Sequence, residues 1–385
     1  MTATSISAPR RKRFRWVNVR EHLTGYLFIL PSVALISLFG FFPIGYAIYM
    51  STRHWRVRKG DFIGLANYQK ALGDWTGALI FAIGIGLLFL AYIVWTNAAK
   101  SKSTWVLALK LLAALILIGA GIVIPMGWGR MIVAGDQDFL QSLPITLYYA
   151  LGTVPLELAL ALILAYILFQ KIRGQELFRM LYFLPYITPV VASAVVFRTI
   201  FSPRDSSLAN VAITSIGLDP QKWLFEPHPI AQVLGLNLKG FFAGPSLALV
   251  SIILFGVWTY VGYNTVIFLA GLGSIPKELY EAAEIDGAGN WQLFRHITIP
   301  LLSPITFYLA LIAFIGTFKA FNHIYVMRVP SAQGTVNVAS VTIFDTFYKA
   351  NAYGYAAAQA ILLFIVILAL TLAQNKIFGE RVFYG

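Results

Sequence analysis

Long apolar runs, separated by short polar stretches, dominate the chain. A helix needs about 20 apolar residues to cross the roughly 30 Å of hydrocarbon in a bilayer. In these runs apolar residues occupy every face of a helix, as burial in a membrane requires. We therefore predict an all-α, polytopic membrane protein. The eight predicted spans are Leu23–Met50, Thr76–Asn97, Trp105–Met126, Leu143–Phe169, Met180–Phe201, Ser246–Gly271, Leu301–Phe321 and Tyr355–Ala373.

Composition supports this assignment and excludes several other classes. Charged residues make up 12% of the chain and the mean hydropathy is +0.74, whereas soluble domains average about 25% charged residues. The absence of cysteine excludes disulfides, thiolate catalysis and cysteine-ligated metals. The net charge of +13 does not indicate nucleic acid, because no basic stripe with interleaved stacking aromatics occurs. We expect the basic residues to contact membrane lipid and to set the topology.

A basic cluster between Arg10 and Arg20 precedes the first apolar run. That run is too long for a signal peptide and no small-x-small cleavage site follows it, so it is predicted to be an uncleaved span. The positive-inside rule places the cluster in the cytoplasm, and an even number of spans then places both termini there. The predicted cytoplasmic segments are 1–22, 98–104, 170–179, 272–300 and 374–385.

The cytoplasmic segment 273–300 carries signals for two short helices outside the membrane. Ser274 and Pro276 form a predicted helix start, because a hydroxyl can cap the first turn and proline fits within it. Gly287 can end this helix in a left-handed conformation. Asn290 can then cap a second short helix. The segment therefore predicts a helix–turn–helix held between two spans.

The first of these helices combines acidic and small residues. Glu278 and Glu281 fall in its first turns, where the helix dipole favours negative charge. Ala282 and Ala283 keep one surface thin, so another backbone can approach closely. Such a helix suits a groove on a partner protein, and its position between two spans would transmit the partner's motion to them.

The same loop contains Glu-Ala-Ala, a glycine four residues later, and Ile-Thr-Ile-Pro at its end. This pattern resembles the EAA loop of permease subunits of binding-protein-dependent ABC importers, with Ile299 in place of the usual leucine. The resemblance implies that a separate ATPase docks here. The implied docking residues are Glu281, Ala282, Ala283, Asp286, Gly287, Ile297 and Pro300.

Further segments are similar to the carbohydrate, maltose-type subgroup of these permeases, namely 62–71, 184–189, 258–280 and 354–385. The resemblance implies a six-span type I permease core in a bacterial-type inner cell membrane. It also implies three kinds of protein partner: ATP-binding cassette ATPase subunits, a second permease that completes a heterodimer, and an extracytoplasmic solute-binding protein.

Two stretches depart from the resemblance. Segment 76–132 inserts a pair of spans that returns the chain to the same side, and we expect it to be peripheral, where it could bind lipid or a partner. Segment 325–333 lacks the threonine and paired Gly-Pro of relatives, which weakens inference about the substrate. The predicted divisions are the tail 1–22, the first span and outer loop 23–75, the insertion 76–132, the permease core 140–373 with its loop 273–300, and the tail 374–385.

Polar residues inside the predicted spans mark where a solute could pass, because they are costly in lipid. Glu157 lies in mid-span, and aromatic and amide groups on the sixth span would suit a sugar ring and its hydroxyls. Hydrogen bonding between helices is the competing interpretation for each of them. The predicted substrate-path residues are Glu157, Trp258, Tyr263, Asn264, Thr317 and Asn322.

Motif searches limit the chemistry of the chain itself. No His-Glu-x-x-His or carboxylate cluster indicates a metal site, and no Gly-x4-Gly-Lys-Ser/Thr phosphate loop occurs. We therefore predict a non-enzymatic subunit without a cofactor of its own, since ATP and Mg²⁺ would bind to the partner ATPase. The predicted function is the permease subunit of an ATP-driven importer of a sugar or oligosaccharide. The alternative is a secondary transporter of a small polar solute that uses Glu157 as a coupling carboxylate, although no internal repeat supports it.

Overall fold

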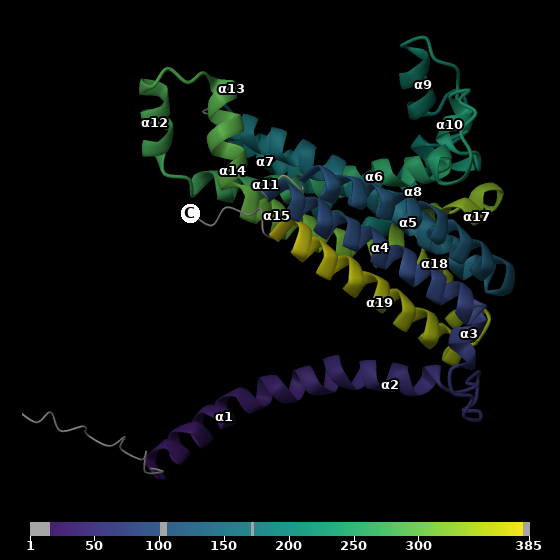
Figure 1. Cartoon of the computed structure of the whole chain (residues 1–385). Helices are drawn as coiled ribbons and strands as arrows, with labels where there is room; N and C mark the ends of the chain where they lie inside the picture. Colours follow the sequence, from purple (N-terminus) through teal and green to yellow (C-terminus); the bar gives the residue numbers. More distant parts are fainter. Residues whose placement is uncertain (1–15, 101–105, 171–172, 380–385) are drawn as a thin grey trace, which may run out of the picture.

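The computed structural model describes residues 16–100, 106–170 and 173–379. Regular structure in these residues is helical, apart from two isolated β-bridges, Arg53↔Phe62 and Pro229↔Ser246. The predicted basic cluster between Arg10 and Arg15, the linker 101–105 and the last residues of the C-terminal tail lie outside the described residues. Figure 1 shows long helices that run side by side, with short helices at both ends.

Within the described residues, six continuous helices are long and apolar enough to cross a membrane. The first is α1 (Trp16–Ile36), which continues through a π-helical turn (Ser37–Phe41) into α2 (Phe42–Ser51). The others are α4 (Trp75–Lys100), α5 (Val106–Ala134), α6 (Gln137–Phe169), α11 (Leu247–Gly273) and α19 (Tyr353–Phe378). They confirm six of the eight predicted spans as continuous helices.

The remaining two predicted spans correspond to bent helix pairs, so the described residues contain eight spans if each bent pair counts as one. The first bent pair is α7 (Gln175–Ile187) and α8 (Val190–Ile200), which meet at 95°. Thr188 is extended and Pro189 precedes α8, because proline lacks an N–H and disfavours helical backbone in the residue before it. The second pair joins the stretch Asn290–Leu301 to α15 (Ser303–Phe318) at 61°.

Short helices fill the connections. Between α2 and α4 lies α3 (Ala66–Leu72), and between α8 and α11 lie α9 (Leu208–Thr214), Trp223–Phe225, α10 (Ile230–Val233) and Gly240–Ala243. One end of the bundle carries α12 (Lys277–Ile285) and α13 (Asn290–Leu293), followed by a π-helical turn (Phe294–Thr298) and α14 (Ile299–Leu301). The opposite end carries α16 (Asn322–Met327), Pro330–Ala332, α17 (Gln333–Val336), α18 (Ala339–Phe344) and Asp345–Lys349.

The core of the bundle is built on α6 and α11. Ala161 and Ala165 of α6 pack with Phe268 and Leu272 of α11, and all four are nearly inaccessible. The α7 backbone lies so close to α11 that a Cβ on Gly262 would fall 1.7 Å from the Tyr182 carbonyl oxygen. Small residues therefore set the short distances between the central helices.

The predicted insertion is a helical hairpin of α4 and α5. The two helices pack chiefly against each other, and a Cβ on Gly127 of α5 would fall 2.4 Å from the Phe81 nitrogen of α4. Tyr92 donates a hydrogen bond to the Ile377 carbonyl of α19 at 3.4 Å. The prediction of two spans in this segment is therefore confirmed, and their status as an insertion and their role remain predictions.

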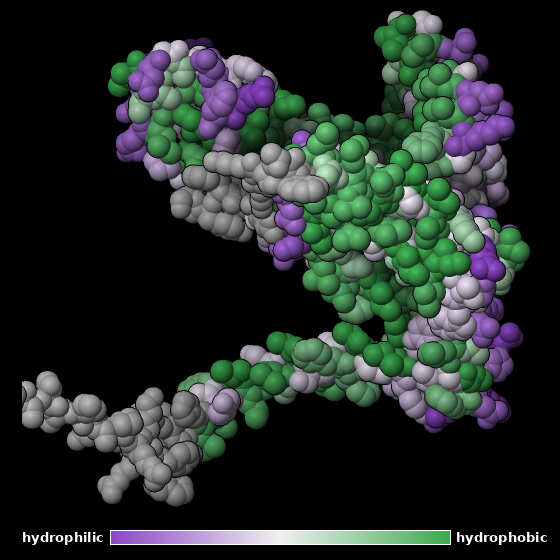
Figure 2. Space-filling view, viewed as in Figure 1, coloured by the Kyte–Doolittle hydropathy of each residue, from purple (hydrophilic) through white to green (hydrophobic). Residues whose placement is uncertain are grey.

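The helix α1–α2 leaves the bundle as a long arm, and α2 meets α19 near its end (Figure 1). None of the best apolar window in Leu23–Ser51 is buried, against 61% of the window in α11. The burial therefore identifies α11 as a central helix, and α1–α2 as a helix whose sides are open to lipid or a partner protein. Figure 2 shows the matching surface, a broad apolar zone with hydrophilic residues gathered towards the two ends of the bundle.

Candidate functional sites: the projecting helix and the tyrosine-lined cavity

The helix α12 projects from the end of the bundle on a loop between α11 and α13 (Figure 1). Its start differs from the prediction: the Ser274 hydroxyl donates to the Gly271 carbonyl at 2.7 Å, so it belongs to the end of α11. Pro276 directly precedes α12, and no side chain caps the helix. The cap position of α13 also lies one residue earlier than predicted, at Gly289, whose N–H donates to Gln292 Oε1 at 2.8 Å.

The end of α12 agrees with the prediction. Gly287 has φ +82°, in the left-handed region. Its N–H donates to the Glu284 carbonyl at 3.0 Å, and the Ala288 N–H donates to the Ala283 carbonyl at 2.9 Å. These two bonds form a Schellman motif, which satisfies the last carbonyls of a helix when a glycine supplies the positive φ.

Contacts beneath α12 fix the loop to the bundle. The Tyr280 hydroxyl lies 3.0 Å from Thr298 Oγ1, and Tyr280, Ile275 and Ile297 pack with the core shared by α6, α11 and α15. Phe294 packs against Tyr166 of α6, with ring centroids 4.7 Å apart. The α12 loop is therefore in packing contact with three long helices, α6, α11 and α15.

The outer side of the loop is polar and unpaired. Within the described residues no ion pair involves its four carboxylates, Glu278, Glu281, Glu284 and Asp286. A hollow of about 270 Å³ lies between α12 and α13, and Ala283, Asp286, Gly287 and Ile297 of the predicted docking set line it. Glu281 and Ala282 are exposed on α12, while Pro300 lies further along the chain in α14.

Sequence reasoning missed two exposed apolar residues in this loop. Ile285 is 86% exposed at the end of α12, and Trp291 is 67% exposed on α13. Each is an apolar residue next to a turn in an otherwise polar stretch, which was the available signal. Their exposure fits a surface that a partner covers.

The second candidate site is a cavity of about 180 Å³ among α6, α7, α11 and α15. Five tyrosines line it: Tyr149, Tyr186, Tyr260, Tyr263 and Tyr308. The Tyr186 and Tyr263 rings are stacked, with centroids 4.6 Å apart. The cavity is therefore lined by several aromatic ring faces and phenolic hydroxyl groups.

Two buried polar side chains at this cavity each have one atom without a hydrogen-bond partner. Glu157 is 3% exposed and Asn264 is 4% exposed. Neither Glu157 Oε2 nor Asn264 Nδ2 has a hydrogen-bond partner within the protein. Because an unsatisfied buried polar atom costs about 1–3 kcal/mol, its occurrence at a cavity indicates a ligand or water. No Lys or Arg is among the described residues that line the cavity.

The structure brings together four of the six predicted path residues, namely Glu157, Tyr263, Asn264 and Thr317. Trp258 does not line the cavity; its ring packs on Phe197 with centroids 4.8 Å apart. Asn322 is exposed at the start of α16, also outside the cavity. Tyr260, Tyr263 and Asn264 share one face of α11. Trp258 lies two residues before Tyr260, and residues two apart in a helix point to different faces.

Four cavity tyrosines were absent from the predicted set: Tyr149, Tyr186, Tyr260 and Tyr308. Tyr260 is four residues before Asn264, and Tyr149 is eight residues before Glu157. Both spacings place a pair on one helix face, which was a usable signal. Tyr186 reaches the cavity from the bent helix α7, and Tyr308 from α15. Their convergence depends on tertiary packing.

Comparison with known proteins matches residues 157–384 to the family of the binding-protein-dependent transport system inner membrane component. The chain belongs to this family. The arabinooligosaccharides transport system permease protein AraP of Bacillus subtilis is 33% identical over 257 residues, 66% of this chain and 76% of AraP. The lactose transport system permease protein LacF of Rhizobium radiobacter is 29% identical over 285 residues, 71% of this chain and 88% of LacF.

A solved structure shares the fold. It is described as a bacterial ABC transporter involved in the import of the acidic polysaccharide alginate, and it matches with a TM-score of 0.63 at 18% identity, over 95% of this chain and 98% of that chain. The protein is thus a multi-pass membrane permease of an ABC importer. Family membership does not favour the alternative of a secondary transporter coupled through Glu157.

Proposed function

We propose that this permease imports a neutral sugar or oligosaccharide through the tyrosine-lined cavity, driven by an ATPase that docks on α12 and its adjoining loop. The single observation that supports a sugar as the transported substrate is the set of residues that line the cavity. Tyrosine faces suit the apolar faces of sugar rings, and the unpaired atoms of Glu157 and Asn264 suit their hydroxyls. The names of AraP and LacF, which refer to arabinooligosaccharides and lactose, support a sugar cargo.

The proposed preference for a neutral cargo follows from charge. A uronate sugar brings a carboxylate, whose charge is best compensated by a cation when it leaves water. The described lining offers the carboxyl group of Glu157 and no Lys or Arg. An acidic sugar would therefore be disfavoured here, in contrast with the acidic polysaccharide named for the structural neighbour.

In this proposal the energy for transport comes from ATP hydrolysis by partner subunits. The exposed carboxylates of α12 and the rigid connection to α6, α11 and α15 support docking of an ATP-binding cassette subunit, which would bind ATP and Mg²⁺. In this proposal α12 faces the cytoplasm with both termini, and a second permease lies along α1, the part of the open arm farther from α19. The family description supports an extracytoplasmic solute-binding protein as the donor of the cargo.

Uptake into proteoliposomes tests the cargo. The complete transporter, with its co-encoded ATPase and binding protein, is supplied with a neutral trisaccharide or the matching uronate trisaccharide. We expect ATP-driven uptake of the neutral sugar, and a loss of about twofold to tenfold in Glu157→Leu, since a hydrogen bond contributes about 0.5–1.5 kcal/mol. Asn322→Leu, exposed outside the cavity, is the matched control and should transport normally.

Two results would contradict the proposal. One is a wild-type transporter that imports neither sugar, because this result would contradict a sugar as the transported substrate. The other is equal uptake by Glu157→Leu and Asn322→Leu, which removes the cavity as the passage. Preferred uptake of the uronate would overturn the charge argument alone.

A further inference from the structure

A strongly basic loop follows α2. Residues 53–59 read Arg-His-Trp-Arg-Val-Arg-Lys, and this segment is called the basic loop. Arg56, Arg58 and Lys59 are exposed, and within the described residues no cation of the loop pairs with a carboxylate. The Nε of Arg53 is buried without a hydrogen-bond partner. None of the four cations therefore forms an ion pair with a carboxylate in the part of the chain that the structure describes.

The basic loop lies at the end of α2 far from α12 (Figure 1). In the proposed orientation, on which this inference rests, that end faces away from the cytoplasm. Lys and Arg are usually concentrated on the cytoplasmic side of a membrane protein. A dense cluster on the other side therefore calls for a specific anionic partner.

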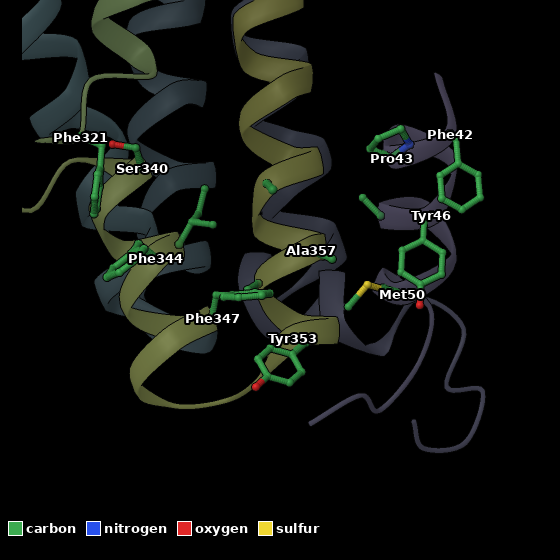
Figure 3. Close-up of a pocket in the computed structure, with 14 residues that line it drawn as sticks. Phe42, Pro43, Tyr46, Met50, Phe321, Ser340, Phe344, Phe347, Tyr353 and Ala357 are labelled. Carbon is green, nitrogen blue, oxygen red and sulfur yellow. The ribbon is translucent and has the colours of Figure 1, made fainter. Parts of the chain in front are cut away.

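An apolar cavity of about 550 Å³ lies directly beside this end of α2. Figure 3 shows its walls: Phe42, Tyr46 and Met50 of α2 on one side, with Phe344, Phe347 and Ala357 among the residues across from them. Its volume falls within the roughly 300–1,000 Å³ of typical ligand sites. Its lining is almost wholly hydrocarbon, so it suits an acyl chain.

Aromatic rings connect the basic loop to the cavity. Tyr49 carries the Arg53 guanidinium 4.6 Å and the Lys59 ammonium 5.4 Å from its ring centroid. The Trp55 ring lies 5.9 Å from that of Tyr46, which lines the cavity. Tyr and Trp are enriched at the level of lipid headgroups. Cations, interfacial aromatics and an apolar cavity thus follow one another along α2, in the order of headgroup, interface and acyl chain.

We propose that the basic loop and the cavity between α2 and α19 together bind an anionic phospholipid, with the phosphate against Arg56, Arg58 and Lys59 and an acyl chain in the cavity. Cations near an anionic lipid surface each add to binding, and the acyl chain fixes the lipid in place by burial of its methylenes. Such a lipid would hold the base of the α1–α2 arm against α19.

Native mass spectrometry of the purified transporter tests this proposal. The complex is taken from nanodiscs of phosphatidylcholine with a minor fraction of phosphatidylglycerol, and retained lipid is counted. We expect one retained phosphatidylglycerol in the wild type, and about a tenfold lower preference over phosphatidylcholine in Arg56→Gln/Arg58→Gln/Lys59→Gln. The matched control, Arg204→Gln/Lys222→Gln/Lys239→Gln, removes three exposed cations between α8 and α11 and should keep the preference.

The cavity has its own variant. Ala357→Phe fills it and should abolish retention of either lipid, whereas Ala114→Phe, on an exposed face of α5, should not. Equal losses in both charge variants, or retention that survives Ala357→Phe, would overturn the site. So would a cross-link from Ala357→Cys to the second permease in a complex without retained lipid, since a protein helix would then fill the cavity. Sugar uptake by the wild type is scored separately, so failure of the lipid site is distinguishable from failure of the proposed cargo.

Discussion

The projecting α12 loop and the tyrosine-lined cavity use carboxyl groups in opposite surroundings. On α12, Glu278, Glu281 and Glu284 are exposed, and water satisfies them without any protein partner. In the cavity, Glu157 is 3% exposed and one of its oxygens has no protein partner. An unpaired carboxylate in water is stable, whereas an unpaired buried one is not. The carboxylates of α12 can therefore stay exposed without a partner, and Glu157 marks a place suited to a ligand or water.

If the two regions divide the work between drive and passage, their variants should fail in different ways. A change in the α12 loop should lower association with the ATPase and leave the affinity for cargo unchanged. A change in the cavity should alter the KM of uptake and leave the complex intact. A loop variant that changes the KM, or a cavity variant that lowers ATPase association, would break the division.

The largest effect is expected from Gly287→Leu. A side chain at φ +82° costs about 1–2 kcal/mol, so the turn after α12 should rearrange and uptake should fall by about tenfold or more. Gly289→Leu is the matched control, because Gly289 has φ −80° and tolerates any residue. Recovery of ATPase subunits with the tagged permease, measured together with uptake, should fall only for Gly287→Leu. Normal transport by that variant would argue against docking at this turn.

An intermediate effect is expected within α11. Tyr263→Ala removes a stacked ring from the cavity and should raise the KM for sugar uptake by about twofold to tenfold, because aromatic contacts contribute about 0.5–1.5 kcal/mol. Trp258→Ala removes a larger ring from the same helix outside the cavity and should leave KM unchanged. ATPase recovery should be normal in both. A KM that rises for Trp258→Ala alone would move the passage to the face of α11 that meets α8.

The smallest effect is expected from charge reversal on α12. Glu281→Lys should weaken ATPase association by about twofold to fivefold, since exposed charge pairs contribute little, and the loss should shrink at high salt. Glu278→Lys makes the same change one turn earlier, outside the predicted docking set. Equal losses at both positions would show that net charge, and not a local contact, matters for docking.

The sequence predicted a large part of the fold for a simple reason. Lipid imposes a length and an apolarity on each span, and both can be counted along the chain, so six continuous helices were found, among them the α4–α5 hairpin. Gly287 was predicted as the end of α12, because a Schellman motif depends on a few neighbouring residues. Ser274 was wrongly predicted as a cap, because the end of one helix and the start of the next compete for a hydroxyl between them.

The site could be predicted only in part. Glu157 and Asn264 were found because polar groups are rare inside spans, and Thr317 was found for the same reason. Trp258 lies outside the cavity, because rarity says nothing about which face of α11 meets which neighbour, and its role in the path remains a prediction. Tyr186 was missed because it reaches the cavity on α7, whose 95° angle to α8 a hydropathy count does not register.

The sequence by itself therefore determined the membrane class, the number of apolar segments and the local form of the α12 loop. Each depends on the solvent or on residues within a few positions of one another. Only the tertiary structure decided that five tyrosines from four helices enclose Glu157 and Asn264, and that a basic loop adjoins an apolar cavity beside α2. Those arrangements depend on the distances and rotations at which the helices pack. Side chains that are far apart in the sequence determine these distances and rotations together.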